Sequence, residues 1–334
     1  MERYSHSILN EDILKLPGFE SFCYQNCQRI LLQAMGVKYP ELYINATLSL
    51  NFNTKSGVVG MGSRIRSLLP SVDKYVFRTE YETESAEEIF SENKAFIIKN
   101  KIPVIVGADT FYLPYASNYM KNHARHTLLL CGFDESADNV SIVDWYPDWY
   151  FKGTVPTKLF LKSRGSDNPY DGTIFSGCAI KNNCAYIERF EEKNPSVLIR
   201  ELLSVMRSEY YSAPTDSIVY GIDAVVAIQS RIMDENDAVF FKSLHKKINI
   251  TSKRYKFFRQ YILSASKVMN LADFESSVIC LDNVINDWDI ILMLLLKASM
   301  APGERIKARL KSKTDMLIND EEILKSKLLK LRVN

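Results

Sequence analysis

The sequence predicts an α+β domain at residues 1–190 and an all-α domain at residues 191–334. First, a chain of 334 residues is longer than one hydrophobic core usually holds, which favours two domains. Second, the first part mixes helical periodicity with short apolar runs rich in β-branched residues, which are typical of buried strands. Third, helical periodicity dominates after about residue 192, and strand signals are few there.

The regular structure of the first domain is expected to begin with a helix at Cys23. Apolar residues at Ile30, Leu31 and Ala34 follow helical spacing, and Gly36 gives the helix a C-terminal stop. The other predicted elements are a helix at residues 85–99, strands at 101–110, 126–133 and 140–145, a turn at 134–139 and a loop at 162–177.

The second domain is predicted to contain five or six helices. Its candidate helical segments are residues 195–211, 218–233, 237–247, 252–269, 274–300 and 321–331.

The composition excludes several classes of protein. Hydrophobic residues make up 46% of the chain and charged residues 25%, which excludes intrinsic disorder and fibrous repeats. The formal net charge of +2 argues against a broad basic surface for nucleic acid. Residues 1–20 lack the apolar segment of a secretory signal, and the longest apolar run, residues 290–296, is too short to cross a bilayer. We therefore expect a cytoplasmic protein with no nucleic-acid or membrane partner.

The six cysteines are too few for a disulfide scaffold in a chain of this length. Cys23 and Cys27 have the spacing C-x3-C, and His123 and His126 could supply a second pair of zinc ligands. No known zinc-module signature accompanies this spacing, so we predict no metal and no cofactor, with a zinc site as the alternative.

Three residues could form a catalytic triad. Cys23 stands at the predicted start of a helix, where the helix dipole and the backbone N–H groups lower a thiol pKa and can hold an oxyanion. His126 opens one predicted strand, and Asp144 ends the next strand. Adjacent antiparallel strands can place a base and its orienting carboxylate side by side, as a Cys–His–Asp triad requires.

Each of these residues also has a purely structural explanation. Cys23 could be a small buried residue, His126 a partly buried strand residue and Asp144 a turn former. Cys27 is the competing thiol, but the dipole effect has faded one turn into the helix, which favours core packing for Cys27. The sequence by itself does not decide between the two cysteines.

The segment before His126 is rich in polar and aromatic residues that could contact a substrate. An exposed carboxylate such as Asp109 could hold a cationic amine, and tyrosines could stack on an aromatic acyl chain. The structural alternative is a strand end followed by a loop with satisfied hydroxyl groups. His123 is an alternative base, although strand alternation would direct it away from His126. The candidate substrate-binding residues are Asp109, Tyr112, Tyr115, Tyr119, His123 and Cys27.

These motifs carry a family resemblance over roughly residues 20–190. CYQNCQRILLQAMG (residues 23–36), HTLLLCGFD (126–134) and VDWYP (143–147) resemble the nucleophile helix, histidine strand and aspartate segment of papain-like cysteine peptidases. The chain more closely resembles the butirosin biosynthesis protein H family, whose members are papain-fold acyltransferases. This resemblance rests on PVIVGADTFYLPYASNYMKNHARH (103–126) and on an R-x-S-x-N-P element at residues 164–169.

The resemblance implies a papain-like cysteine-protease fold with an additional all-α C-terminal domain. It also implies an amide-forming acyltransferase of thiotemplated antibiotic biosynthesis, with amide synthetases of the closthioamide type among its relatives. Cys23 would take an acyl or peptidyl chain from the phosphopantetheine thioester of an acyl carrier protein. His126 would move protons, Asp144 would orient His126, and a small-molecule amine would accept the chain.

One departure from the peptidase pattern affects the choice of reaction. Papain-like peptidases place a Gln six residues before the thiol to complete the oxyanion hole, and Pro17 occupies that position here. This weakens the peptidase interpretation more than the acyltransferase interpretation, because a thioester is already activated and an amide is not. The alternatives are a cysteine peptidase or thioesterase with the same triad, and a non-catalytic papain-like metabolite-binding protein.

Overall fold

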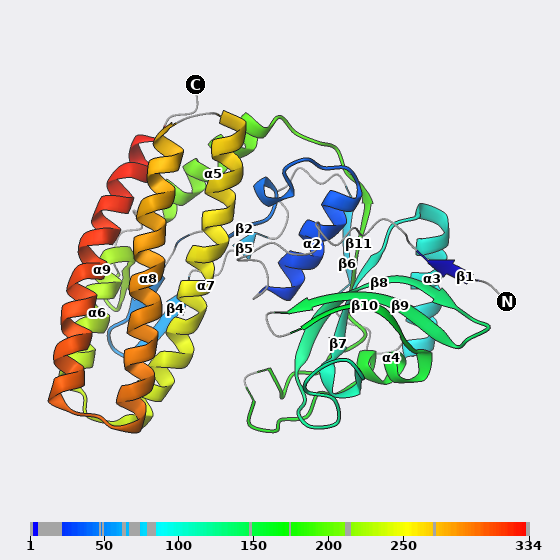
Figure 1. The fold of residues 1–334 in the computed structure, drawn as a ribbon, viewed down its shortest axis with the longest axis horizontal. Coiled ribbons are helices and arrows are strands. Elements are labelled where there is room, and N and C mark those ends of the chain that lie inside the picture. Colours follow the sequence, from blue (N-terminus) through cyan, green and yellow to red (C-terminus); the bar gives the residue numbers. More distant parts are fainter. Residues whose placement is uncertain are drawn as a thin grey trace. The chain divides into compact units, whose positions relative to one another are not determined.

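The chain divides into two compact units (Figure 1). Unit 1 comprises Met1–Pro40 and Leu68–Glu192, and unit 2 comprises Glu41–Ser67 and Lys193–Asn334. Residues 41–67 thus group with the C-terminal helices, and a functional division at residue 190 stays a prediction. The computed structural model describes residues 3–5, 22–46, 48, 50–61, 65–66, 74–78, 85–146, 149–173, 175–210, 215–269 and 272–331.

Unit 1 is built around a seven-stranded sheet in the order β10-β9-β8-β7-β11-β6, with β1 paired to β8. Each described pairing is antiparallel. With its helices, this unit confirms the predicted α+β class. The strands are β1 (Arg3–Ser5), β6 (Lys74–Arg78), β7 (Val104–Asp109), β8 (Arg125–Asp134), β9 (Asn139–Tyr146), β10 (Trp149–Pro156) and β11 (Cys184–Arg189).

Helices cover both faces of this sheet (Figure 1). Helices α3 (Ala86–Asn100) and α4 (Thr157–Arg164) bury apolar side chains against one face, where they form a core with β7, β8 and β9. Helix α2 (Cys23–Ala34) contacts the sheet mainly through β8. It ends as predicted, because Gly36 adopts the left-handed backbone (φ 90°) that favours glycine after a helix.

The predicted helix at residues 85–99 is α3, and its start follows a recognisable signal. Ser85 Oγ accepts a hydrogen bond from the Glu88 N–H, and the Glu88 carboxylate accepts one from the Ser85 N–H. This reciprocal capping satisfies two backbone donors that the first turn leaves open.

Three long helices dominate unit 2: α7 (Ala238–Met269), α8 (Ala272–Met300) and α9 (Glu304–Lys330). They pack in sequence order, α7 on α8 and α8 on α9, and bury Trp288 almost completely. The other elements of this unit are α5 (Pro195–Tyr210), α6 (Gly221–Asp234), β2 (Asn45–Ala46), β3 (Leu50–Asn53), β4 (Val58–Met61), β5 (Ile65–Arg66) and β12 (Ile218–Tyr220).

Three sequence expectations for the C-terminal part were wrong. The helix predicted at residues 321–331 is the last part of α9, which begins at Glu304. The predicted helices at residues 237–247 and 252–269 form the single helix α7, because residues 248–251 contain no glycine or proline to interrupt it. Residues 218–220, expected in a helix, form β12 and pair with β3. Ile218 and Val219 are β-branched, and pairing with an available strand outweighs the helical periodicity that follows. The part after residue 190 is therefore not entirely helical.

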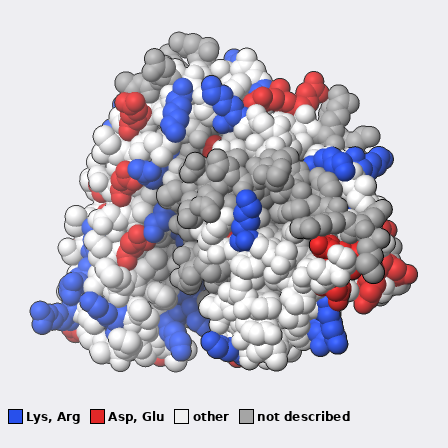
Figure 2. Space-filling model, turned by 45° about the vertical axis from the view of Figure 1, so that its right-hand side comes forward, with Lys and Arg blue, Asp and Glu red and all other residues white. Residues whose placement is uncertain are grey.

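The described surface agrees with the balanced composition. On the face shown in Figure 2, basic and acidic side chains are interspersed. Within the described residues, no helix combines the length and the apolar character that crossing a membrane needs.

Candidate active site

Cys23 is the first residue of α2. The cap residue Phe22 gives the helix no side-chain hydrogen bond, and the first backbone bond runs from the Asn26 N–H to the Phe22 carbonyl, at 2.8 Å. The thiol therefore stands at the positive end of the helix dipole, next to the N–H groups of the first turn. Cys23 itself is only partly buried, so a substrate can reach it.

His126 and Asp144 come from the paired strands β8 and β9. Leu129 lies opposite Val143, so continuing this register makes His126 and Asp144 diagonal neighbours. His126 Nε2 lies 2.7 Å from Asp144 Oδ1, and both side chains are buried. A carboxylate only accepts hydrogen bonds, so Nε2 carries the proton and Nδ1 is the nitrogen left for another partner.

That partner is the Cys23 thiol, which is hydrogen-bonded to His126. Burial raises the pKa of Cys23, but the charge of His126 and hydrogen bonds with His126 and Thr127 outweigh it, so the pKa is lowered overall. Burial alone would lower the pKa of His126, but the charges of Asp144 and Cys23 raise it to about 10. The pair therefore favours a thiolate beside an imidazolium.

The other carboxylate oxygen of Asp144 also has a partner, which the sequence analysis missed. The Tyr115 hydroxyl donates a hydrogen bond to Asp144 Oδ2 at 2.7 Å. The Tyr115 ring stacks on Phe151 with 3.9 Å between ring centres, and Phe151 is the cross-strand partner of Asp144. Burial and the Asp144 charge raise the pKa of Tyr115 well above its usual value, so the phenol keeps the proton it donates. Tyr115, expected to contact substrate, instead holds the carboxylate.

The structure separates the two candidate thiols. Cys27 lies one turn into α2, is buried, and directs its Sγ to the Thr127 carbonyl at 3.6 Å. Burial, together with the charges of Cys23 and Asp144, raises the pKa of Cys27 well above its usual value. Cys27 thus stays a protonated thiol packed in the core, and the geometry favours Cys23 as the nucleophile.

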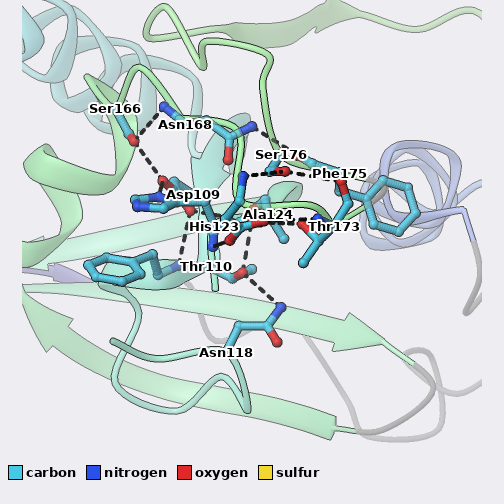
Figure 3. Close-up of polar contacts among 12 residues, drawn as sticks. Asp109, Thr110, Asn118, His123, Ala124, Ser166, Asn168, Thr173, Phe175 and Ser176 are labelled. Atoms are coloured by element: carbon cyan, nitrogen blue, oxygen red, sulfur yellow. Dashed lines mark hydrogen bonds and ion pairs between the residues drawn. The ribbon is translucent and has the colours of Figure 1, made fainter. Parts of the chain in front are cut away.

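Asp109 is not the exposed carboxylate that the sequence analysis expected. It is completely buried, and its two oxygens are surrounded by hydrogen-bond partners within the chain (Figure 3). Oδ1 accepts from the backbone N–H groups of Phe111 and Ala124, at 3.0 and 3.2 Å. Oδ2 accepts from Ser166 Oγ at 2.6 Å and lies 2.7 Å from His123 Nδ1. A fully buried carboxylate with this set of partners cannot also hold a substrate amine at the surface.

The Asp109 contacts close the loop that carries Tyr115. Phe111 and Ala124 stand at the two ends of this loop, so a single carboxylate binds both ends. The Thr110 N–H donates to the Ala124 carbonyl at 3.0 Å and reinforces the closure. The role of Asp109 in this geometry is to shape the loop that positions Tyr115.

Residues 23–145 match the family model described as butirosin biosynthesis protein H, N-terminal. This segment is similar to that family. The matched segment begins at Cys23 and ends one residue after Asp144, so it contains all three residues of the hydrogen-bonded chain. No curated protein matches the chain.

The R-x-S-x-N-P element lies beyond the segment matched to the butirosin biosynthesis protein H family, but it contacts that segment. Ser166 donates to Asp109 and accepts a hydrogen bond from the Asn168 N–H at 2.9 Å. The Asn168 side chain donates to the carbonyls of Phe175 and Cys178, each at 2.9 Å. Arg164 is buried and donates to Asn93 at 3.1 Å and to the Asn182 carbonyl. The element therefore fixes the loop at residues 165–178 against Asp109.

The remaining predicted substrate residues are His123, Tyr112 and Tyr119. His123 stacks on Phe111 with 4.2 Å between ring centres and, with Tyr112, lines a separate cavity of about 760 Å³. Tyr119 is half-buried, and its backbone N–H donates to the Ala116 carbonyl. Within the described part of the chain, no group of three or more His, Cys, Asp or Glu side chains has the geometry to hold a metal ion.

Proposed function

We propose that this chain is a cysteine-dependent acyltransferase that forms amides. The observation that carries the proposal is the continuous chain of contacts from the Cys23 thiol through His126 to Asp144, with the pKa of the thiol lowered and that of the imidazole raised. Such a pair supplies a nucleophile and a proton carrier at neutral pH. We further propose that unit 1 has a papain-like fold, which the nucleophile helix beside an antiparallel sheet supports.

In the first half-reaction the Cys23 thiolate attacks the carbonyl carbon of an acyl thioester. The tetrahedral intermediate collapses, its bond to the departing sulfur breaks, and the proton on His126 goes to that sulfur. The products are an acyl group on Cys23 and a free thiol. In the second half-reaction an amine attacks the acyl carbon, His126 takes the amine proton, and the Cys23 thiolate leaves as the amide forms.

Helix α2 can stabilise the negative oxygen of both intermediates. Backbone N–H groups in the first turn of a helix point outward along its axis, and the helix dipole favours negative charge there. Pro17, which replaces the expected Gln of peptidases, lies outside the described residues. An oxyanion site built on backbone donors suffices more readily for a thioester than for an amide, since the thioester carbonyl is already activated.

We propose an acyl or peptidyl carrier protein as the donor and a small-molecule amine as the acceptor. The support is the family, which takes its name from a butirosin biosynthesis protein. A peptidase or thioesterase would use the same three side chains, so transfer and hydrolysis have to be distinguished by their products.

The test is to incubate the purified protein with an acyl thioester, with and without an added diamine or amino sugar. We expect amide to accumulate only when the amine is present, with slow release of free acid in its absence. Free acid formed at the same rate with and without amine, and no amide, would contradict the transferase proposal and favour a hydrolase. A Cys23→Ala variant serves as the control, and normal turnover by that variant would favour the non-catalytic binding protein.

A further inference from the structure

A pocket of about 300 Å³ lies next to the proposed nucleophile. Three of its lining residues are chain neighbours of the reacting groups: Tyr24 follows Cys23, and Arg125 and Thr127 flank His126. Thr127 is also hydrogen-bonded to the Cys23 thiol. A group attached to Cys23 therefore has this pocket next to it.

Four of the lining residues come from two neighbouring strands and carry no charge. They are Ile105 and Gly107 of β7 and Cys184 and Ala185 of β11, all of them buried. Ala185 lies opposite Ile105 in the β11–β7 pairing. The small side chain of Ala185 leaves space in the pocket that a larger side chain would fill.

Arg125 is the one charged residue among those that line the pocket. Arg125 is exposed, and its guanidinium donates to Cys178 Sγ at 3.1 Å. The other six lining residues carry no charge, so a carboxylate that does not reach Arg125 would be buried without a charged partner, which is costly. The pocket thus suits an uncharged chain.

We propose that this pocket binds the acyl group carried on Cys23, and that it selects a short, uncharged aliphatic or single-ring aromatic acyl chain. This inference rests on the proposed function. A water molecule occupies about 30 Å³ of liquid, so the pocket holds about ten non-hydrogen atoms. Acetyl, butanoyl, benzoyl and octanoyl groups fit within that limit, whereas a dodecanoyl group exceeds it.

The test measures how fast the protein is acylated by the N-acetylcysteamine thioesters of these five acids and of glutaric acid, followed by intact-mass spectrometry. We expect octanoyl and benzoyl transfer to be at least as fast as acetyl transfer. Dodecanoyl transfer should be about tenfold slower than octanoyl transfer, because overpacking is strongly unfavourable. Glutaryl should be slower than the uncharged butanoyl chain.

Two variants test the assignment in opposite directions. Ala185→Leu narrows the pocket and should slow octanoyl and benzoyl transfer about tenfold more than it slows acetyl transfer. Ile105→Ala widens the pocket and should raise dodecanoyl transfer relative to octanoyl transfer. Ile187→Ala is the matched control, because Ile187 is fully buried in β11 but does not line the pocket. That control should leave the chain-length preference unchanged.

The outcomes distinguish a wrong pocket assignment from a wrong proposed function. Acylation at equal rates for all chain lengths, or an equal loss for acetyl and octanoyl in Ala185→Leu, overturns the pocket assignment alone. No acylation by any of the thioesters overturns the proposed function and, with it, the pocket assignment. Acetyl transfer by each variant reports whether its active site is folded, so a misfolded variant cannot pass for a selective one.

Discussion

Replacing Asp144 with Asn should lower the pKa of His126, so that its imidazole loses its positive charge at a lower pH. The substitution keeps the shape of the side chain and an oxygen that can accept the Tyr115 hydrogen bond, but it removes the negative charge 2.7 Å from His126 Nε2. That charge is the largest influence that raises the pKa of His126, which is about 10 against an ordinary value of 6.5. We expect the pKa of His126 to fall from about 10 toward its ordinary value of 6.5.

Nitrogen NMR of the imidazole rings measures this change directly. The chain has four histidines, and a His126→Gln variant identifies the resonance of interest. In the unaltered protein, His126 should remain protonated from pH 5 to pH 8. In Asp144→Asn it should be largely neutral at pH 8, and thioester attack should slow because the thiolate has lost its counter-charge. A resonance that titrates near pH 6.5 in the unaltered protein, or one that the substitution leaves unchanged, would refute the reasoning.

Three further predictions follow from the same contacts. Because the pKa of Cys23 is lowered and that of Cys27 is raised, iodoacetamide should alkylate Cys23 at a pH below that at which a free thiol reacts, and it should spare Cys27. Preferential labelling of Cys27, mapped by mass spectrometry, would contradict this. Tyr115→Phe removes the hydrogen bond to the Asp144 carboxylate and should lower the acylation rate about tenfold with little change in melting temperature. The control Tyr119→Phe should change neither quantity, and equal effects of the two substitutions would count against a role of Tyr115 in positioning Asp144. Asp109→Asn should reduce the free energy of unfolding by about 3 kcal/mol in urea titrations, because it disrupts a buried network that closes a loop, and an unchanged midpoint would show that the network is not structural.

The start of α2 and the strands β8 and β9 could be predicted from the sequence because each has a local signal. Glycine at position 36 marks a helix end, β-branched runs mark strands, and a turn between strands predicts their pairing. These local signals place Cys23, His126 and Asp144 at or near the ends of the predicted elements. The hydrogen bonds among these three side chains could be identified only from the structure.

The contacts that sequence reasoning missed depend on residues far apart in the chain. Tyr115 reaches Asp144 across 29 residues and Ser166 reaches Asp109 across 57, and no spacing rule predicts either contact. The same limitation explains why Asp109 was expected to be exposed. A polar residue at a strand end is often at the surface, and only the assembled donors show that this one is buried. The pocket beside Cys23 likewise combines residues from α2, β7, β8 and β11.

The most direct test of the central claim is the site of acylation. The protein is incubated with a butanoyl thioester, its intact mass is measured, and the modified peptide is sequenced by tandem mass spectrometry. The account predicts a single butanoyl adduct on Cys23, which is lost in Cys23→Ser and retained in Cys27→Ala. An adduct on Cys27, or one that forms equally well in Cys23→Ser, would contradict it.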